Sequence, residues 1–496
     1  MNMDAGVEGF GGQSSHSRGR RTLLKAMGAA AAAVLAAPRL LRAQNRSSVL
    51  VIGAGLSGLA AALLLEEAGA NVRVIEGRRR IGGRIQSVRA LPGAPESGGA
   101  GLTPGYARLM DAARRHGVEL IDLRPVLGYY GQREMFLDGQ HVPLADWPDH
   151  PRNPFPKSAR EVPPWAFLRD VMARANPLKS VDAWLAPENS ALDISFYDWL
   201  RQQGVSDDSI RVAYDIEPAH GNTAYDVSAL MLLFVSSFAT AQSKMAKPGQ
   251  SPILTARGGN QSIPEAMARA LKNEVELGRN VVAIHDAGDQ VEVRCADGKT
   301  YRADHVICSV PCAVLRRIDI LPPLPAQQER AVQTLDSEIV NLVHMAPAAP
   351  FWEADGLSPN MFSDGLVCNL VGEHKGADPV DVTSVTAWIR GHKAAMLDQI
   401  PEAEARAMVL ADIARLRPAS KGKLEIIEYK SWYRDPYSAG DWAIWKPGQV
   451  TALAPQVGKA HGRLHFCGEH TAIANRGMEG AMESGERVAL EVMGHL

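Results

Sequence analysis

The chain has 496 residues, of which 46% are hydrophobic and 22% charged, and its formal net charge is −2. This composition is typical of a globular protein with more than one core, and it lacks the basic excess of proteins that bind nucleic acid. No apolar run reaches the roughly 18 residues that a membrane-spanning helix needs, so we expect no stable membrane anchor. The cysteines are too few and too widely spaced for a disulfide framework or a metal site, which favours buried thiols at Cys295, Cys308, Cys312, Cys368 and Cys467.

The first forty or so residues have the pattern of an export signal. The run Arg20–Lys25 resembles a twin-arginine signal, a weakly apolar and alanine-rich stretch follows at Ala26–Ala37, and Leu41–Ala43 offers a small-residue cleavage site. We expect residues 1–43 to be a signal peptide and the mature protein to be periplasmic or secreted by a bacterium. A disordered basic arm is the alternative.

A glycine-rich turn follows the first predicted strand. The strand spans Ser48–Ile52, the turn contains Gly53, Gly55 and Gly58, and an apolar helix continues over Leu59–Ala68. In such a unit the three glycines permit a tight turn, close approach of a pyrophosphate and close packing of helix on strand, in that order. The helix N-terminus adds unpaired N–H groups that attract phosphate. The pattern therefore predicts a dinucleotide-binding site, against the alternative of a turn that binds nothing.

The second predicted strand, Asn71–Glu76, ends on an acid. Glu76 can accept hydrogen bonds from both ribose hydroxyls of a dinucleotide, and it would repel a 2′-phosphate, which argues against NADP. FAD and NAD proteins share this pattern, so the following segment, Arg78–Arg84, must distinguish them. There Gly83 can pass close to a pyrophosphate and Arg84 can pair with it, unless the segment is a basic surface turn.

A similar strand–turn–helix pattern closes the chain, with Leu464–Thr471 followed by Gly477–Gly485. Together with the N-terminal motif it resembles the flavin amine oxidase family, which includes monoamine oxidase, polyamine oxidase, L-amino acid oxidase and the secreted bacterial amine oxidases of nicotine pathways. The resemblance runs from about Ser48 to the C-terminus. It implies an α/β fold in which a discontinuous, Rossmann-like FAD-binding domain carries an inserted α+β substrate domain.

The resemblance also implies the domain boundaries. Three stretches build the FAD-binding domain, at residues 44–110, 251–320 and 456–496. Two inserted stretches, residues 111–250 and 321–455, build the substrate domain. In the family the C-terminal stretch closes the FAD site.

Several residues are implied by the resemblance to contact FAD. They are Gly98 and Gly99 in the turn beside the flavin, Val281 at the adenine, Gly468 and Glu469 near the ribityl chain and phosphates, and Met478 at the flavin ring. By the same resemblance, we expect the helix that begins near Gly480 to direct its N-terminus at the pyrimidine edge of the flavin, which would stabilise the negative charge gained on reduction.

The segment Trp432–Trp442 resembles the stretch of monoamine oxidase that holds the flavin-linking cysteine and one wall of an aromatic cage. Asp441 stands at the place of that cysteine, and a carboxylate cannot form the thioether, so we expect noncovalent FAD. Trp442 stands at the first cage position, where it would guide a neutral amine to the flavin. Trp432 matches a tryptophan that packs beside the flavin. A core-filling role is the alternative for both tryptophans.

Two departures from the family pattern bear on the chemistry. The second cage position falls on Gly477, so we expect half a cage and space for a bulky substrate. The family lysine that is linked to the reaction with oxygen would fall in Ile339–Leu342, and that stretch contains none. The electron acceptor is therefore left open between oxygen and a periplasmic cytochrome or quinone.

The implied reaction is the oxidation of a C–N bond. The flavin would take a hydride equivalent from the carbon beside the nitrogen, and water would hydrolyse the imine to an aldehyde or ketone plus ammonia or an amine. Secondary amines on an aromatic ring system are the first expectation. The alternatives are an L-amino acid oxidase with Arg476 facing the substrate carboxylate, a flavin desaturase, and a noncatalytic FAD-binding protein. A homodimer is left open, and no metal site is expected.

Overall fold

The computed structural model describes residues 47–245, 253–374 and 381–496. The predicted signal peptide lies outside the described residues. Ser47–Leu496 forms one compact unit, and the domain boundaries inside it stay a prediction. Within the described residues, no helix has the length and apolar character required to cross a membrane.

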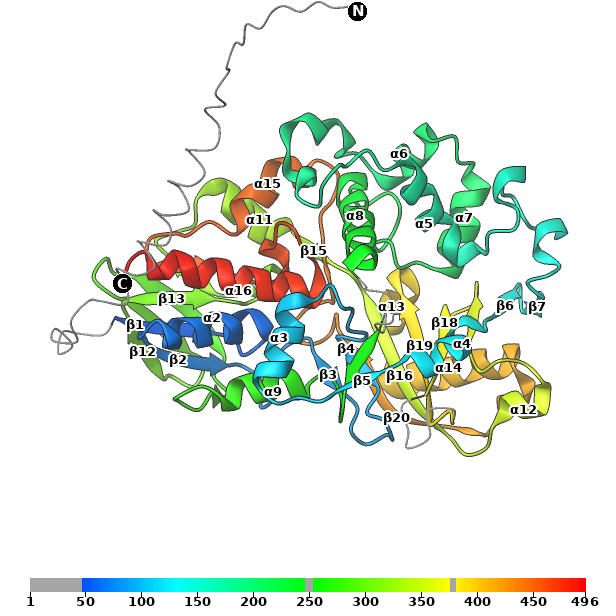
Figure 1. Ribbon diagram of the computed structural model, residues 1–496, viewed down its shortest axis with the longest axis horizontal. Coiled ribbons are helices and arrows are strands. Elements are labelled where there is room, and N and C mark those ends of the chain that lie inside the picture. The colour runs from blue at the N-terminus through cyan, green and yellow to red at the C-terminus, as the bar shows by residue number, and fades with distance from the viewer. Residues whose placement is uncertain (1–46, 246–252, 375–380) are drawn as a thin grey trace, which may run out of the picture. The chain divides into compact units, whose positions relative to one another are not determined.

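A parallel five-stranded sheet takes its strands from three distant stretches of the chain (Figure 1). The order across the sheet is β22-β13-β1-β2-β9. These strands span Ser48–Ile52 (β1), Asn71–Glu76 (β2), Glu276–Leu277 (β9), His305–Cys308 (β13) and Leu464–Phe466 (β22). The sheet confirms the predicted α/β class with a discontinuous, Rossmann-like domain.

Both faces of this sheet are covered, which explains why β1 is apolar from Val49 to Ile52. Val49 and Val51 pack with the helices on one face, whereas Leu50 and Ile52 belong to the core on the other face. The helices are α2 (Leu56–Glu67), α3 (Ala107–Arg115), α9 (Ser262–Arg269) and α16 (Gly477–Met493). The other face packs against a sheet of order β12-β11-β10-β14, with strands at Val281–Asp286 (β10), Val291–Cys295 (β11), Thr300–Ala303 (β12) and Asp319–Leu321 (β14).

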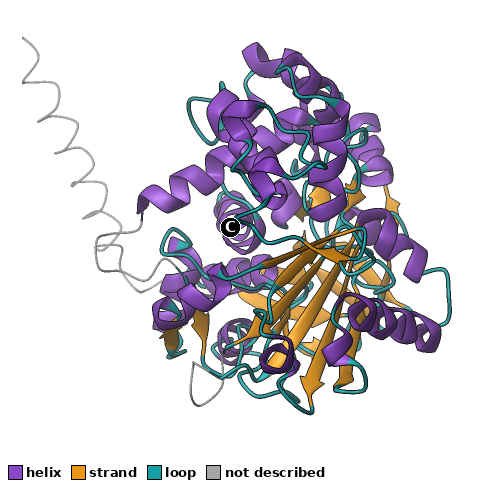
Figure 2. Cartoon of the chain, turned by 90° about the vertical axis from the view of Figure 1, so that its right-hand side faces the viewer, coloured by secondary structure: helices purple, strands orange, loops and turns teal. Residues whose placement is uncertain are grey.

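A seven-stranded sheet of order β20-β16-β19-β18-β17-β6-β7 forms the second part of the fold, and Figure 2 shows its strands side by side. They span Glu134–Leu137 (β6), Gln140–His141 (β7), Val340–Pro347 (β16), Met361–Ser363 (β17), Asn369–Glu373 (β18), Ser384–Arg390 (β19) and Leu424–Ser431 (β20). One face packs against α12 (Phe351–Asp355), α13 (Gly391–Leu397) and α14 (Glu402–Leu416).

Alternation along β19 directs the Trp388 side chain away from those helices. Ala387 and Ile389 are buried in the core with α13 and α14. Trp388 lies between them in sequence and packs instead with Leu342 and Trp432 on the opposite face. Because successive side chains of a strand point to opposite faces, Trp388 reaches the space between the two large sheets.

A helical layer completes the second part, as the helices above the sheet in Figure 2 show. Stacked rings tie it together, with centroids 3.9 Å apart for Phe155 and Phe167 and 4.7 Å apart for Trp184 and Phe234. Its main helices are α5 (Pro164–Ala175), α6 (Phe196–Gln202), α7 (Asp207–Ile216) and α8 (Ala229–Met245). Sheet and helices together give the α+β substrate part that the sequence predicts.

Shorter elements connect these layers. The helices are α4 (Leu127–Gly131), α10 (Cys312–Leu315), α11 (Ala326–Thr334) and α15 (Gln449–Val457). The short strand pairs are Gln86–Ser87 with Glu96–Gly98 (β3, β4), Leu120–Asp122 with Leu254–Ala256 (β5, β8), and Asp336–Ser337 with Ala443–Ile444 (β15, β21).

Candidate active site

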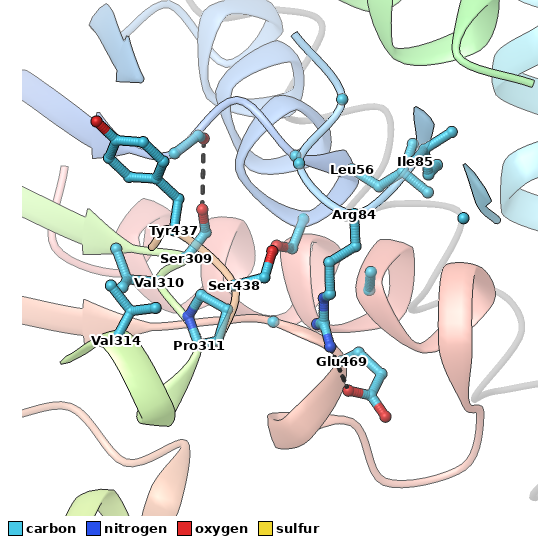
Figure 3. A pocket seen from close by; sticks show the side chains of 18 of the residues that line it. Leu56, Arg84, Ile85, Ser309, Val310, Pro311, Val314, Tyr437, Ser438 and Glu469 are labelled. Carbon is cyan, nitrogen blue, oxygen red and sulfur yellow. Dashed lines mark hydrogen bonds and ion pairs between the residues drawn. The ribbon is translucent and has the colours of Figure 1, made fainter. Parts of the chain in front are cut away.

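A cavity with an empty volume of about 1500 Å³, including its open mouth, lies at the carboxyl ends of β1, β2, β13 and β22 (Figure 3). It extends to Trp388 in β19. Ligands of open α/β sheets bind at this end of the strands. Thirteen of the fifteen site residues expected from the sequence line it: Gly53, Gly55, Glu76, Gly83, Arg84, Gly98, Gly99, Val281, Trp442, Gly468, Glu469, Gly477 and Met478. Gly58 and Trp432 do not.

The glycines in the turn after β1 expose its backbone to the cavity. Gly53 has a φ of +107°, and a Cβ there would lie 2.2 Å from Ser309 Oγ. The Ser309 hydroxyl donates to the carbonyl oxygen of Ile52 at 2.8 Å (Figure 3). A Cβ on Gly58 would come within 2.1 Å of the Gly53 carbonyl oxygen, so Gly58 permits helix–strand packing and has no place in the cavity wall. No side chain among the described residues caps the N-terminus of α2, which leaves it open to a phosphate group.

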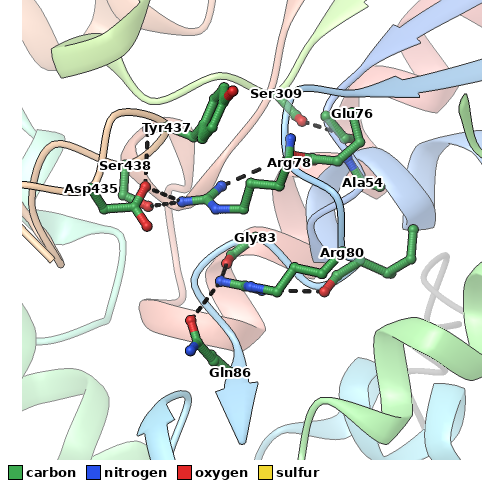
Figure 4. A network of polar contacts seen from close by, with 12 residues as sticks. Ala54, Glu76, Arg78, Arg80, Gly83, Gln86, Ser309, Asp435, Tyr437 and Ser438 are labelled. Carbon is green, nitrogen blue, oxygen red and sulfur yellow. Dashed lines mark hydrogen bonds and ion pairs between the residues drawn. The ribbon is translucent and has the colours of Figure 1, made fainter. Parts of the chain in front are cut away.

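Arg80, which the sequence analysis missed, holds the second glycine turn against the first. A Cβ on Gly83 would lie 3.2 Å from the Cα of Gly55. The Arg80 guanidinium donates to the carbonyl oxygens of Gly83 at 2.8 Å and Ile85 at 3.1 Å (Figure 4). Burial lowers the pKa of Arg80 to about 10, so the group remains charged at neutral pH. The arginine-rich segment is thus an internal brace, not a basic surface turn.

Glu76 is fixed at the cavity wall by backbone groups. Its two carboxylate oxygens accept from the N–H groups of Ala54 and Arg78, each at 2.8 Å (Figure 4). The Arg78 guanidinium is itself engaged, because it donates to Asp435 and Ser438 at 2.6 Å. A buried, oriented carboxylate at the end of β2 is the acceptor that a ribose diol requires.

Arg84 joins the N-terminal and C-terminal segments across the cavity. Its guanidinium donates to the carbonyl oxygen of Asp441 and lies 3.5 Å from a carboxylate oxygen of Glu469 (Figure 3). The same Glu469 oxygen accepts from the N–H of Ala443 at 3.4 Å. Arg84 therefore fixes the relative position of two chain segments that both line the cavity.

Trp432 lies one layer behind the cavity wall and supports it. The side chain is fully buried, and its Nε1 donates to the carbonyl oxygen of Ser97 at 2.6 Å. A Cβ on Gly98 would lie 2.8 Å from the Trp432 ring, so only glycine lets this strand pass so close. On the other side, Asn260 donates its side-chain amide to the carbonyl oxygen of Gly99 at 2.7 Å. Trp432 and Asn260 thus position the glycine strand without facing the cavity.

Aromatic side chains from three separate elements line the end of the cavity beyond the glycine turns. Trp442 lies there as expected, and Tyr106 and Trp388, which the sequence analysis missed, line the same space. The Tyr106 hydroxyl and the Trp442 Nε1 each lie 3.9 Å from the position of a Cβ on Gly477. Tyr106 therefore borders the gap that Gly477 leaves opposite Trp442. No local pattern marks Tyr106, whereas the β19 alternation could have singled out Trp388.

Charged groups surround these rings. The guanidinium carbon of Arg390 lies 4.8 Å from the ring centroid of Trp388 and 5.7 Å from that of Trp442. Arg390 forms an ion pair with Glu338 at 2.7 Å. Burial, and next the negative charge of Glu338, raise the pKa of Asp441 to about 7. A carboxyl group that titrates near neutral pH therefore lies in the wall of the cavity.

These features fit FAD. Bare glycine backbone and an uncapped helix N-terminus suit a pyrophosphate, Glu76 suits a ribose, and the aromatic end suits a planar ring and its substrate. All five cysteines are buried, and none of them is among the described residues that line the cavity. No thiol of the described lining is therefore available for a thioether, which agrees with the expectation of noncovalent FAD. Over the described residues, no group of three His, Cys, Asp or Glu side chains is arranged to hold a metal ion.

Replacing Glu76 by alanine is expected to weaken FAD binding. The substitution removes the ribose acceptor and the two backbone contacts that shape the wall, and a charged hydrogen bond contributes about 1.5–3 kcal/mol. Equilibrium dialysis should show the loss of FAD on dilution, while the molecules that keep FAD are reduced by substrate at the normal rate. The control is Glu292→Ala, which removes a half-buried acid on β11 that is paired with Arg302 at 2.9 Å and lies outside the cavity lining. Full FAD occupancy in the Glu76 variant would contradict the assignment.

Replacing Asp441 by asparagine is expected to stabilise the protein at alkaline pH. Because the folded state holds the proton more tightly than the unfolded chain, wild-type stability falls as pH rises from about 4 to about 7. The variant lacks this loss, so its thermal midpoint should exceed that of the wild type above pH 7 and converge with it near pH 4. The shift of the Asp441 pKa by about three units limits the gain in folding free energy of the variant to about 4 kcal/mol.

The control for this experiment is an aspartate whose pKa is lowered in the folded state. The N–H of Lys299 lowers the pKa of the exposed Asp297, so Asp297→Asn should gain nothing at alkaline pH. A pH-independent difference between wild type and the Asp441 variant would refute the raised pKa.

Known proteins with related sequences are flavoenzymes. The chain matches the family of flavin containing amine oxidoreductases over residues 56–493. It is 27% identical over 474 residues to the flavin-containing amine oxidase of Danio rerio, which covers 90% of this chain and 86% of the relative. It is 28% identical over 476 residues to the flavin-containing amine oxidase B of Cavia porcellus, with the same coverage.

Solved structures of bacterial amine oxidases share the fold. Putrescine oxidase bound to putrescine superposes with a TM-score of 0.73 at 24% identity, covering 90% of this chain and 99% of that one. Cyclohexylamine oxidase from Brevibacterium oxydans gives a TM-score of 0.73 at 21% identity, covering 91% of this chain and 99% of that one. With a family match over nearly all of the described residues and a cavity that fits FAD, the chain belongs to the flavin-containing amine oxidoreductases and oxidises an amine with FAD.

Proposed function

We propose that this protein is an exported amine dehydrogenase, which oxidises a bulky amine and passes the electrons to an acceptor other than oxygen. The observation that carries the choice of acceptor is the composition of the cavity wall. Its described lining contains neither lysine nor histidine, and its arginines are Arg78, Arg84 and Arg279, each engaged with a carboxylate.

The strand expected to supply the family lysine offers an apolar side chain instead. Leu342, in β16, is buried and packs against Trp432 and Trp388. A positive charge beside the flavin would favour the transfer of an electron to oxygen, because that step creates an anion. Without such a charge at this place, reduced FAD is expected to react slowly with oxygen and to depend on another acceptor, of the cytochrome or quinone class.

The aromatic end of the cavity supports a bulky substrate. Bound FAD supplies the chemistry, by accepting a hydride equivalent from the carbon beside the nitrogen. Trp442, Trp388 and Tyr106 restrict the poses of the amine and exclude water from it. Gly477 leaves space between them that a second full aromatic ring would fill. The amine is expected to react in its neutral form, because an ammonium group withdraws electrons from the carbon that must release the hydride equivalent.

The acceptor is tested by reoxidation of the reduced enzyme. Enzyme reduced anaerobically with its amine is mixed with air-saturated buffer, with a soluble quinone, or with cytochrome c. We expect oxygen to reoxidise the flavin slowly, and at least one of the other acceptors to do so at a rate that matches turnover. Leu342→Lys should accelerate the reaction with oxygen, and Leu342→Met is the matched control. Reoxidation by oxygen at the turnover rate in the wild type would show that the protein is an oxidase.

Export in the folded state is supported by the way the cavity is built. Both β1, near the start of the fold, and α16, at its end, contribute lining residues, so FAD can be enclosed only after the whole chain has folded. A cofactor bound in this way must be loaded before export, and the twin-arginine route carries folded proteins. The pair Arg20 and Arg21 at the start of the chain resembles the signal for that route.

The export signal is tested by replacing Arg20 and Arg21 with lysine, which keeps the charge. In a bacterium with the twin-arginine route, the double variant is expected to accumulate in the cytoplasm with FAD bound, whereas the wild type reaches the periplasm. Cell fractionation and flavin fluorescence measure both. An unchanged periplasmic yield of the double variant would exclude this route.

A further inference from the structure

Two histidines on neighbouring strands of the parallel sheet are in hydrogen-bond contact outside the cavity lining. His305 begins β13, and His465 lies in β22 opposite Ile307, two residues after His305. Residues two apart on a strand share a face, so both rings point toward α2 and α16, as Ile307 does. His305 Nδ1 lies 3.1 Å from His465 Nε2, and both side chains are buried.

The C-terminal part of α16 covers these two rings. A carboxylate oxygen of Glu491, in the last turns of the helix, lies 2.7 Å from His465 Nδ1. His495, which follows α16, stacks on His305 with ring centroids 5.5 Å apart, and its ring lies 5.9 Å from that of His465. The contacts from His305 through His465 to Glu491 therefore connect the end of α16 to two strands of the sheet.

This chain of hydrogen bonds can hold one excess proton but not two. A carboxylate only accepts, so His465 Nδ1 donates to Glu491. When His465 is neutral, its Nε2 accepts from His305 Nδ1–H, and when His465 is charged, its Nε2–H donates to His305 Nδ1. If both rings were charged, two N–H groups would face each other across 3.1 Å. The second proton therefore breaks the hydrogen bond between the two rings.

Burial and neighbouring charges oppose that second proton. Burial, and next the neighbouring His465, lower the pKa of His305 to about 4. Burial alone would raise the pKa of Glu491, but the hydrogen bond from His465 outweighs it, and the pKa of Glu491 is lowered. A histidine in an unfolded chain has a pKa of about 6.5, so the closed arrangement loses stability as pH falls from about 6.5 to about 4. The charged groups that face the two rings are Asp304 before β13, Arg463 before β22, Arg487 and Glu491 on α16, and His495 after it.

The three elements that these bonds connect also build the cavity wall. The lining residues that follow β13, follow β22 and begin α16 are Ser309, Val310, Gly468, Glu469, Gly477 and Met478. Arg487 connects the two regions, because its guanidinium donates to Glu491 at 3.2 Å, to the carbonyl oxygen of Phe466 at 2.6 Å and to the hydroxyl of Thr471 at 3.3 Å. Phe466 and Thr471 flank the turn that carries Gly468 and Glu469. Release of the α16 end is therefore expected to disturb this part of the FAD site.

We propose that His305, His465 and Glu491 form an acid-sensitive latch, which keeps the FAD site closed while at most one histidine is charged and lowers the affinity for FAD when both are charged. Loss of the bond between the rings frees the end of α16 from β13 and β22. The turn between Phe466 and Thr471 then loses the support that Arg487 gives it. The inference depends on FAD binding, and it holds for any amine and any electron acceptor.

The affinity for FAD at two pH values tests the latch. Dissociation of FAD from the holoenzyme is followed by flavin fluorescence at about pH 7.5 and about pH 5, for the wild type and for His305→Asn. Asparagine places an amide N–H near the position of Nδ1, so it can donate to His465 but cannot take up a proton. We expect the Kd of the wild type to rise about tenfold or more at the lower pH, and that of His305→Asn to rise less than about threefold.

His285→Asn is the matched control, because His285 is exposed on β10 and lies outside the cavity lining. This variant should lose FAD as the wild type does. Asp441 also titrates between the two pH values, so the three proteins are compared with one another at each pH. A wild-type Kd that does not rise at the lower pH, or an equal rise in His305→Asn, would overturn the latch.

Hydrogen exchange of the wild-type holoenzyme gives a test that needs no variant, in case His305→Asn does not fold. Exchange is measured at the same two pH values and corrected for the intrinsic effect of pH on the exchange rate. Peptides from β22 and from the end of α16 should lose about tenfold or more of their protection at the lower pH, whereas α14 should keep its protection. Equal protection of the α16 end at both pH values would show that the contact does not open.

Discussion

The close packing of α2 on α16 is the constraint on which the rest of the site depends. A Cβ on Gly485 would lie 2.4 Å from the carbonyl oxygen of Ser57 and 2.9 Å from the Cβ of Ala60, so only glycine lets the two helices approach so closely. These helices come from opposite ends of the chain (Figure 1). Their contact brings the N-terminus of α2 and the N-terminus of α16 to one cavity. Two uncapped helix ends then face a ligand that carries negative charge at both its phosphates and, when reduced, its ring.

The two ends of the cavity are built on different principles. At the dinucleotide end the wall is mostly backbone, and the side chains there, such as Arg80 and Glu76, hold that backbone in place through hydrogen bonds. At the other end the wall is made of side chains from distant elements, with Tyr106, Trp388 and Trp442 as its rings. The backbone wall of the dinucleotide end suits a cofactor whose structure does not vary. The side-chain wall of the other end can change by single substitutions, because each ring belongs to one side chain.

The buried ion pair at the aromatic end of the cavity costs desolvation free energy, so we expect it to serve the site and not the stability of the fold. Taking Arg390 and Glu338 out of water requires desolvation of both, and such pairs contribute little net stability. The pair instead sets the potential at Trp388 and Trp442, while burial, and next the negative charge of Glu338, raise the pKa of the Asp441 carboxyl to about 7.

The sequence by itself determined the dinucleotide end of the protein. Gly53, Gly55 and Glu76 lie within one strand–turn–helix–strand unit, and local chain geometry brings them together whatever the remaining chain does. Gly468 and Glu469, which follow directly on a buried strand, were assigned from the family resemblance of that segment. Asp441 and Trp442 were assigned in the same way, from the resemblance of Trp432–Trp442, and the structure places all four in the cavity wall.

Only the tertiary structure decided the aromatic end. Tyr106 and Trp388 belong to a turn before α3 and to a strand of the seven-stranded sheet, and they meet Trp442 only when that sheet packs against the parallel one. Tyr106 reaches the gap at Gly477 that the sequence presented as empty. Trp432 differs from these two residues. The family resemblance placed it beside the site, but only the structure showed that it lies behind the cavity wall and does not line the cavity. How deeply a side chain is buried, and which distant side chains it meets, depend on how the layers pack. The periodicity of a sequence shows which face of its own element a side chain occupies, but not where that face lies relative to another layer.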